Sequence, residues 1–345
     1  MYHIVVKSST RHPKVQSASS PVHVWRSFVG AAQRVGGEQS IADMVRFAGH
    51  ARRLLPANLH DSLVDFADAG DRGGALLLRG VPIGSVPATP QSRHGVTKPD
   101  AISEFALLSV ARCLGQPVGY LPEHGGALVQ NLFPTAATAN QQVSTSSTVD
   151  LFFHTETAFH PHRPQYLLLL CLRGEPQART TLCSVDAVID EFSASDVAVL
   201  RQRRFRTGVD ASFGGSKSDP GDTVLLRRTV RSLVDRGPTS ALAVLSGDHE
   251  RPTLVFDADL MIGTDHESDR VLQKLGRLIV DHATSVVLEA GDLLIIDNHR
   301  AVHGRSPFPA RFDGTDRWLQ RTFVVGDLAP SSGERAGRII TTRWE

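Results

Sequence analysis

The sequence predicts a mainly β protein with flanking helices, an antiparallel sandwich or jelly roll rather than a parallel Rossmann-type sheet. From Gly115 onward the chain consists of short apolar runs separated by turn residues, and only residues 271–279 interrupt them with a long helical pattern. Strands that do not alternate regularly with helices favour antiparallel architectures. No stretch within residues 116–330 is typical of a linker. We therefore expect the 345 residues to form one domain, with a helix-rich part over residues 1–72 and the β core over residues 73–328.

The first elements in order are predominantly helical. Apolar residues recur at helical spacing over residues 38–70. The short apolar run 75–78 predicts a buried strand, and the Ser-, Thr- and Pro-rich residues 85–100 predict a loop. Asp100 is a suitable N-cap for the next helix, which we expect to end at Gly115.

The later elements are expected to be strands, because each is a short apolar run bounded by turn residues. These runs cover residues 166–172, 241–245, 253–256, 285–288, 293–296 and 322–325. Residues 271–279 are the exception and predict a helix.

The composition argues against several classes of partner. The chain has 37 Lys and Arg against 36 Asp and Glu, a formal charge of +1, so no overall field attracts nucleic acid or an anionic membrane. No apolar run approaches the roughly 18 residues of a membrane helix, and the first residues lack a signal-peptide pattern. The three cysteines, Cys113, Cys171 and Cys183, form no C-x-x-C pair, as is typical of a reducing compartment. We expect a cytoplasmic protein with no nucleic-acid and no membrane partner.

Three residues far apart in the chain have the side chains of a metal site. His154 and Glu156 follow an apolar run, and if that run ends a strand, side chains two apart project to one face. His303 follows the apolar run 293–296 and is the candidate third ligand. Two histidines and one carboxylate suit Fe(II), whose remaining positions stay open for a co-substrate and oxygen. Taken alone, H-x-E is equally the pattern of two solvated side chains, and His303 that of a histidine capping a loop.

Two arginines stand on one expected strand, residues 316–325. Arg317 and Arg321 are four residues apart, so both face the same side, roughly 13 Å from each other at strand rise. Guanidinium groups bind carboxylates through two parallel hydrogen bonds. This face can therefore hold two carboxylates in one cavity, although a solvated edge strand has the same pattern.

Four segments together carry a family resemblance. They are residues 154–162 (HTETAFHPH), 165–174 (QYLLLLCLRG), 291–308 (GDLL followed by DN-x-R-x-x-HGRSPF) and 313–321 (DGTDRWLQR). In this order and spacing the chain resembles the clavaminate synthase-like enzymes over residues 73–328. These enzymes belong to the Fe(II)- and 2-oxoglutarate-dependent oxygenases, and their branch includes β-hydroxylases of free arginine and asparagine.

The resemblance implies a fold, two cofactors and a reaction. The fold would be a double-stranded β-helix (jelly roll) core. His154, Glu156 and His303 would bind Fe(II), and the enzyme would consume 2-oxoglutarate and O2. The product would be a hydroxylated small-molecule amino acid, formed at C3 by analogy, in specialised, antibiotic-type metabolism.

Further roles follow for the co-substrate. Arg317 would pair with the distal carboxylate of 2-oxoglutarate, and Thr181 would support the same carboxylate. Because Thr180 is adjacent, the register of this threonine stays open.

The resemblance also assigns the α-carboxylate and α-amino group of the substrate. Arg321 would bind the α-carboxylate. Glu123 lies where relatives place a polar contact to the α-amino group, and Gln130 is the competing residue for that role. A plain loop carboxylate is the alternative for Glu123.

The substrate side chain is predicted from Asp257 and Asp259, which share one face if their run is extended. Two carboxylates suit a guanidinium or ammonium group, whereas an uncharged amide needs only one. We expect a free basic L-amino acid, L-arginine first, with lysine and ornithine behind it. The competing interpretation is a single aspartate bonded to backbone at the end of a strand.

Other functions remain compatible with these residues. The same chemistry could act on asparagine or on an amino acid tethered to a carrier protein, and desaturation would need the same site. A jelly-roll binding protein without turnover is a further alternative.

Three remaining features receive structural interpretations. His160 and His162 could be mistaken for part of a zinc cluster, but such a site gives no role to the two arginines. His299 is expected at the surface or in the pocket lining. Residues 214–221 have the polar, flexible composition of a lid or of any surface loop.

Overall fold

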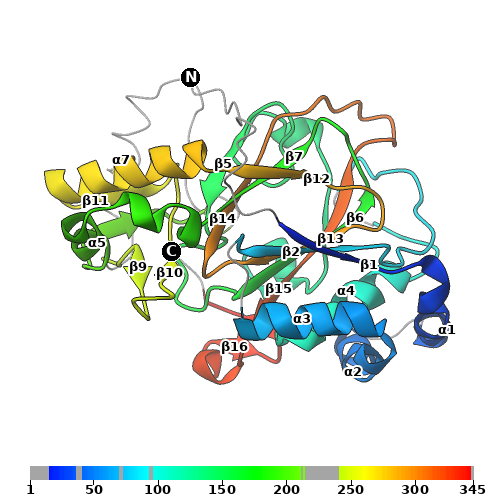
Figure 1. Ribbon diagram of the computed structural model, residues 1–345. Helices are drawn as coiled ribbons and strands as arrows, with labels where there is room; N and C mark the ends of the chain where they lie inside the picture. The colour runs from blue at the N-terminus through cyan, green and yellow to red at the C-terminus, as the bar shows by residue number, and fades with distance from the viewer. Residues whose placement is uncertain are drawn as a thin grey trace.

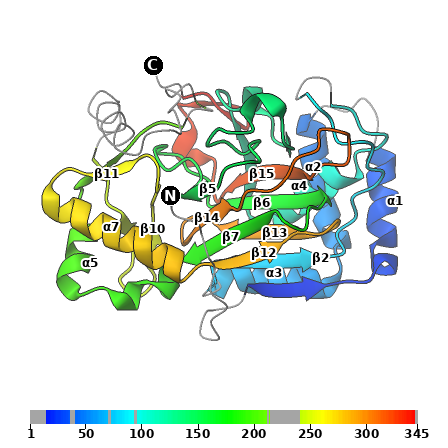
Figure 2. The ribbon, with the colours of Figure 1, turned by 90° about the horizontal axis from the view of Figure 1, so that it is seen from above.

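The computed structural model describes residues 15–35, 41–69, 73–92, 96–210, 213 and 241–342. In this part of the chain the fold is mixed α/β, with two larger sheets, two small hairpin-like sheets and helices on the outside, as Figures 1 and 2 show. Sheets make up the core, as predicted, but helices contribute more than the expectation of a mainly β chain allowed.

The larger sheet has nine strands and is mostly antiparallel. In order they are β1 (Gln16–Ser19), β2 (Ala75–Arg79), β13 (Leu293–Asp297), β6 (Tyr166–Arg173), β15 (Trp318–Val325), β3 (Gln116–Tyr120), β17 (Ile339–Ile340) and β16 (Arg335–Ala336), and β4 (Gln130–Leu132) pairs with the first half of β15. The parallel pairs are β1 with β2 and β17 with β3.

The second sheet is antiparallel and has four strands, β12 (Thr284–Val287), β7 (Arg179–Ser184), β14 (Ala301–Arg305) and β5 (Leu151–His154). Its inner face shares one apolar core with the larger sheet, in which Leu182 meets Leu169, Ile296 and Leu319. The small pairs are β8 (Phe205–Thr207) with β11 (Met261–Gly263) and β9 (Leu245–Ser246) with β10 (Thr253–Leu254).

Helices cover the outer faces of both sheets (Figure 1). On the larger sheet pack α3 (Ala57–Ala69) and α4 (Ile102–Leu114), and α1 (Arg26–Val35) and α2 (Ile41–Ala51) pack in turn against α4. Two others, α5 (Ala194–Leu200) and α7 (His266–Asp281), pack on the outer side of the four-stranded sheet. In the described part of the chain, no helix is both long and apolar enough to cross a bilayer.

Most predicted elements form, with specific differences. The helical region 38–70 is two helices rather than one, because Pro56 cannot continue the first. The carboxylate of Asp100 does bond the first turn of α4, where Oδ1 accepts from Ile102 N–H at 3.1 Å, and the helix ends before Gly115 as expected. The strands β3, β7 and β14 were not among the predicted runs, since polar residues, proline or glycine interrupt their apolar pattern, whereas β5 is the strand considered before His154.

Candidate active site

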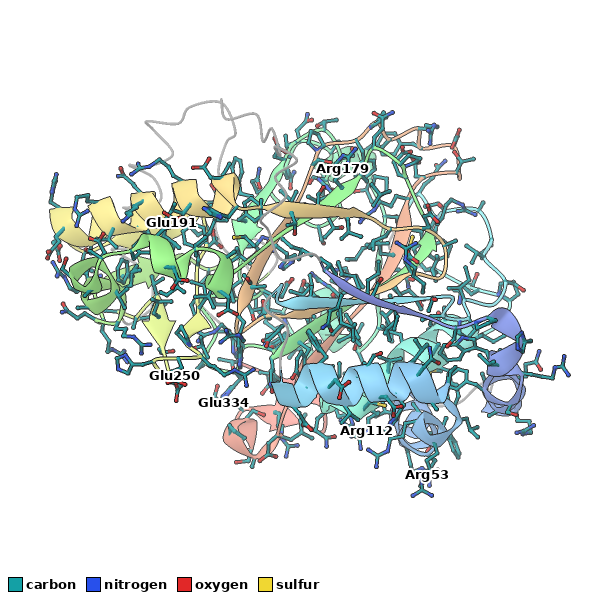
Figure 3. The ribbon with its side chains drawn as sticks, viewed as in Figure 1. Arg53, Arg112, Arg179, Glu191, Glu250 and Glu334 are labelled. Atoms are coloured by element: carbon teal, nitrogen blue, oxygen red, sulfur yellow. The ribbon has the colours of Figure 1, made fainter. Side chains whose placement is uncertain are left out.

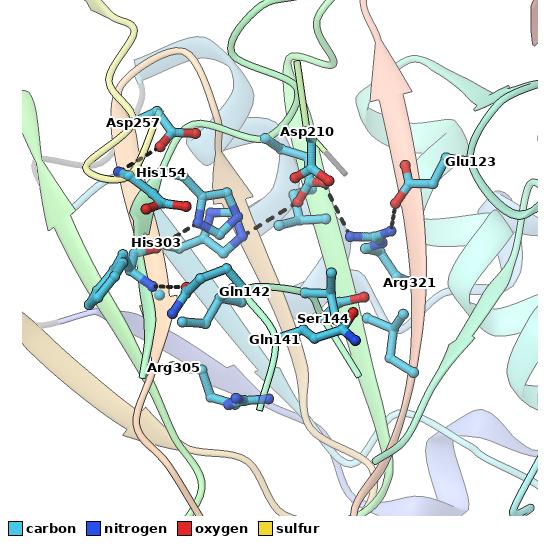
Figure 4. Close-up of a pocket in the computed structure, with 18 of the residues that line it drawn as sticks. Glu123, Gln141, Gln142, Ser144, His154, Asp210, Asp257, His303, Arg305 and Arg321 are labelled. Carbon is cyan, nitrogen blue, oxygen red and sulfur yellow. Dashed lines mark hydrogen bonds and ion pairs between the residues drawn. The ribbon is translucent and has the colours of Figure 1, made fainter. Parts of the chain in front are cut away.

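A cavity of about 350 Å³ lies between the inner faces of the two sheets. Its walls come from β5, β14 and β15, from residues 138–144 and from the turn after β10 (Figure 4). The charged side chains labelled at the periphery, such as Arg53 and Glu250, instead project away from the molecule (Figure 3).

His154, Glu156 and His303 meet in this cavity, and their candidate ligand atoms all lie within 4.8 Å of one another. The two histidines are direct neighbours across the β5–β14 pair, and their ring centroids are 4.3 Å apart. His303 Nε2 is 3.5 Å from Glu156 Oε2. Residues separated by more than 140 positions thus form one group of two imidazoles and one carboxylate.

The secondary structure that places His303 and Glu156 in this group differs from the prediction. His303 does not lie just beyond the end of β13 but inside the following strand, β14. Strand β5 ends at His154, so Glu156 owes its position to a turn rather than to strand alternation. In that turn Thr157 adopts a φ of 51°, and Thr155 N–H donates to Phe256 O at 2.7 Å.

Asn298, which sequence reasoning missed, holds this turn in place. It is fully buried, and its Oδ1 accepts from the Glu156 backbone N–H at 2.7 Å. Its Nδ2 donates to Glu156 O at 3.1 Å and to Pro164 O at 2.9 Å. The only sequence signal was its place in the D-N-x-R pattern that precedes His303.

The electrostatics of the three residues suit a divalent cation. Burial lowers the pKa of His303 to about 4, with His154 adding to the effect, so the ring is neutral and free to act as a ligand. Burial alone would raise the pKa of Glu156, but Arg321 and His303 outweigh it and hold that pKa low. Glu156 is therefore ionised.

The donor set fits iron. Two nitrogens and one carboxylate oxygen converge from one side, which is the arrangement typical of non-haem Fe(II). The Nδ1 of His154 lies 2.7 Å from Phe152 O, a contact of the kind that orients metal-bound histidines. The buried Nδ1 of His303 has no hydrogen-bond partner in the described structure.

Arg321 connects the metal group to a second acidic side chain. Its Nη1 donates to Glu156 Oε1 at 3.2 Å, and its Nη2 forms an ion pair with Glu123. Gln130 stands opposite Arg321 in the β4–β15 pair, and its Oε1 accepts from Arg321 Nε at 2.9 Å. Gln130 is not among the residues that line the cavity, and its contact there is with Arg321.

Glu123 is poised for a further contact. It is 4% exposed, and its Oε2 has no hydrogen-bond partner among the described residues. Burial raises its pKa against the opposing effect of Arg321. A cationic group that reached Oε2 would relieve this penalty.

Arg317 lies at another end of the cavity, just before β15. It is 8% exposed and makes one side-chain hydrogen bond, from Nη2 to Thr180 Oγ1 at 3.3 Å. Within the described residues it has no carboxylate partner, and burial lowers its pKa. An unpaired buried charge is costly, so this arginine is suited to an incoming anion.

The structure favours Thr180 over Thr181 beside Arg317. Thr180 pairs with Arg305 across β7–β14 and lines the cavity, whereas Thr181 pairs with Gly304 on the opposite face. Of the two threonines between which the register was left open, Thr180 is therefore the one that faces the cavity, because alternate strand residues point to opposite sides of a sheet.

Asp257 and Asp259 both line the cavity, but not as members of an extended run. Residues 257–260 form a turn in which Asp257 Oδ1 accepts from the backbone N–H groups of Asp259 and Leu260, at 2.9 and 2.8 Å. The backbone-bonded alternative thus describes one oxygen of Asp257. Burial, then Asp257 and Asp210, raise the pKa of Asp259 to about 7.

Asp210 is a third acidic residue that lines the cavity, on the side of Arg321 in Figure 4, and sequence reasoning missed it. It raises the pKa of Glu123, Asp257 and Asp259 and so belongs to the same electrostatic group. In the view of Figure 4, Asp257 and Arg321 lie on opposite sides of the two histidines. Asp210 follows β8 and belongs to no sequence motif that could have identified it.

The remaining sequence candidates lie outside the cavity or outside the described residues. His160 is buried against Tyr120 and is not part of the metal group, and neither is His162. His299 does not line the cavity. Apart from Phe213, which is buried, residues 211–240 and with them the expected lid over 214–221 lie outside the described residues.

Comparison with known proteins gives consistent matches. Residues 56–323 match the family described as taurine catabolism dioxygenase TauD, TfdA family. The chain is 37% identical to an L-lysine 3-hydroxylase of Catenulispora acidiphila, over 84% of this chain and 78% of the relative. It is also 37% identical to an L-asparagine oxygenase of Streptomyces coelicolor, over 88% and 86%.

A solved relative supports the interpretation of the cavity. The non-heme iron oxygenase OrfP, in complex with Fe and α-ketoglutaric acid, superposes with a TM-score of 0.81 at 30% identity, over 94% of this chain and 99% of OrfP. OrfP has also been solved with Fe, succinate and (3R,4R)-dihydroxy-L-Arg.

Proposed function

Because the chain belongs to the TauD/TfdA dioxygenase family and is a non-heme iron, 2-oxoglutarate-dependent amino-acid hydroxylase, we propose that it acts on a free basic L-amino acid. L-Arginine, hydroxylated at C3, is the proposed substrate. The observation that carries this proposal is the acidic wall formed by Asp257 and Asp259 beside the metal group. A guanidinium or ammonium group would neutralise the charge of these two carboxylates.

The opposite wall suits the α-carbon end of the same molecule. Arg321 would take the α-carboxylate, and the unpartnered Oε2 of Glu123 would take the α-ammonium group. In this arrangement the zwitterion would replace part of the Arg321–Glu123 ion pair. A free amino acid fits both groups, whereas a carrier-tethered one would lack the carboxylate.

The co-substrate is assigned to the remaining buried cation. Arg317 would pair with the distal carboxylate of 2-oxoglutarate, and Thr180 would hold Arg317 in place. Four leucines from the larger sheet supply an apolar surface for the carbon chain, Leu132, Leu167, Leu169 and Leu319.

His154, Glu156 and His303 would hold Fe(II). When bound, iron, 2-oxoglutarate and O2 together replace one C–H bond by C–OH and leave succinate and CO2. The chain's own contribution is to fix the substrate by both ends, so that one carbon faces the metal group, and to exclude water. A desaturation would use the same contacts.

At the level of the fold, we propose that the two facing sheets form the double-stranded β-helix of the family. The N-terminal helices share a buried core with the outer face of the larger sheet, in which Phe28 and Leu59 meet Leu168 and Leu170. This continuity supports one oxygenase domain over the whole chain.

Two alternatives within the same chemistry have support. The similarity to a lysine 3-hydroxylase favours lysine or ornithine on the same acidic wall. The similarity to an asparagine oxygenase favours an amide, which would not need both Asp257 and Asp259. A binding protein without turnover would have no use for Arg317 and the metal group together.

The test is a coupling experiment. The Fe(II)-loaded protein receives 2-oxoglutarate, O2 and one free amino acid at a time, and succinate and hydroxylated product are counted. One succinate per hydroxyarginine supports the proposal, whereas efficient coupling with neutral amino acids alone would reject the basic substrate. A protein that forms no succinate with any amino acid would not act on free amino acids at all.

A further inference from the structure

Arg305 is a second buried arginine in the part of the cavity that contains Arg317. It is 4% exposed, lies two residues after His303 on the same face of β14, and lines the cavity. Its side chain stacks over Phe308, with the guanidinium carbon 5.0 Å from the ring centroid. Neither the metal site nor the proposed substrate contacts use it.

All hydrogen-bond acceptors of Arg305 are uncharged. Nη2 donates to Ser146 Oγ at 2.9 Å and to Val149 O at 3.1 Å, and Nη1 donates to Ser146 O. Nε donates to Ser306 O at 3.1 Å. Three of these four bonds therefore reach a segment of chain more than 150 residues away, which continues directly from the cavity wall over residues 138–144.

Arg305 lies close to Arg317 in the cavity, with Thr180 next to both. Thr180 stands opposite Arg305 across β7–β14, and its hydroxyl accepts the hydrogen bond of Arg317. Among the described residues, neither of these two guanidinium groups has a bonded carboxylate, so this end of the cavity is suited to an anion.

We propose that Arg305 couples co-substrate binding to the cavity wall. An anion bound at Arg317 relieves the repulsion between the guanidinium groups of Arg317 and Arg305. The hydrogen bonds from Arg305 to residues 146–149 then become stronger, and the adjoining wall over residues 138–144 becomes ordered. The ligand class is a 2-oxo acid with a distal carboxylate. This inference rests on the proposed function, since it takes 2-oxoglutarate as the ligand of Arg317. Arg305 is a positioning residue in this scheme, because it acts through Arg317 and the wall.

The test compares two ligands that differ only in the distal carboxylate. Anaerobic Fe(II)-loaded protein is titrated with 2-oxoglutarate and with 2-oxopentanoate, and backbone hydrogen exchange of residues 138–149 is followed with each. In the unaltered protein, 2-oxoglutarate should slow exchange in this segment and 2-oxopentanoate should not. Equal protection by both ligands, or by neither, would overturn the inference without any variant.

The variant Arg305→Met removes the charge and the hydrogen bonds together. Its Kd for 2-oxoglutarate should rise about tenfold or more, because bonds from a charged donor are strong, while its Kd for 2-oxopentanoate should change little. If Arg305 had only a structural role, the variant would raise the Kd for both ligands equally. The matched control is Arg311→Met, since Arg311 is half exposed and paired with Glu175 outside the cavity.

The failure of this inference is distinguishable from failure of the proposed function. If Arg305→Met is folded and retains the preference of the native protein for 2-oxoglutarate over 2-oxopentanoate, the coupling role is wrong and the oxygenase proposal stands. If the native Fe(II)-loaded protein binds no 2-oxoglutarate, both are wrong.

Discussion

The side-chain amide of Asn298 holds the backbone of Glu156 on both sides of the residue, accepting from its N–H at 2.7 Å and donating to its C=O at 3.1 Å. Glu156 stands in a turn beyond β5, so no strand pairing fixes its position. The buried amide therefore replaces the sheet as the support of this carboxylate. Contacts of this kind tune metal affinity because they orient the ligand before the metal arrives.

Replacing Asn298 should weaken Fe(II) binding. In Asn298→Ala the N–H and C=O of Glu156 and the Pro164 carbonyl lose their buried partner, and we expect the Kd for Fe(II) to rise by about 10- to 100-fold. Anaerobic Fe(II) titration measures this directly. An unchanged Kd in a folded Asn298→Ala protein would show that Glu156 is held by other contacts.

Removing a member of the metal group should abolish turnover. Glu156→Ala eliminates the only carboxylate among the three converging residues, so we expect succinate formation to fall by more than about 100-fold. The control is His282→Ala, a histidine near Glu191 and outside the cavity. Retained iron binding and succinate formation in Glu156→Ala would contradict the assignment of the metal site.

The acidic wall should set the preference for a basic substrate. In the double variant Asp257→Asn and Asp259→Asn, the amide of residue 257 still offers the turn its oxygen acceptor, so the backbone contacts survive. We expect kcat/KM for arginine to fall by about 100-fold, since bonds between charged groups are lost. Asp313→Asn, in an exposed turn, is the control. An equal loss for arginine and for neutral amino acids would refute a role in selectivity.

Binding of arginine should depend on pH through Asp259, whose pKa is raised to about 7 mainly by burial. A carboxyl group with a pKa of about 7 is mostly neutral at pH 6 and mostly charged at pH 8. Because the charged form attracts a cation, KM for arginine should fall as the pH rises across this range, by up to about tenfold. Asp259→Asn should flatten the profile, and the same pH trend in that variant would assign the effect to another group.

The two adjacent threonines of β7 should differ in their effect on the co-substrate. Thr180→Val removes the hydroxyl that accepts from Arg317, so KM for 2-oxoglutarate should rise by about tenfold. Thr181→Val alters the opposite face of the sheet and should change that KM by less than about twofold. The reverse order of effects would restore the register first predicted from sequence.

Local patterns were sufficient to predict much of the fold, and the family resemblance predicted the metal group. The apolar run 293–296 and the amphipathic residues 271–279 became β13 and α7, since their periodicity is a property of neighbouring residues. His154, Glu156 and His303 were identifiable because two histidines and a carboxylate recur in one family pattern. That His154 stands opposite His303 is a matter of strand register, which no local pattern contains.

The missed or misplaced residues share a physical cause. Asn298 and Arg305 act through contacts to residues more than 140 positions away, and such contacts exist only once the sheets have paired. Thr180 and Thr181 are chemically identical, so only the β7–β14 register distinguishes them. Asp257 lies in a turn because its own side chain bonds the following N–H groups, which an alternation argument does not anticipate.

The most direct test of the central claim is a competition. The Fe(II)-loaded protein is given 2-oxoglutarate, O2 and an equimolar mixture of arginine, lysine, ornithine, asparagine and leucine, and product masses are followed at early times. The expected result is that arginine gains one oxygen atom ahead of the other amino acids, with one succinate formed per product. Oxidation of asparagine or leucine ahead of every basic amino acid would contradict the role given to the acidic wall.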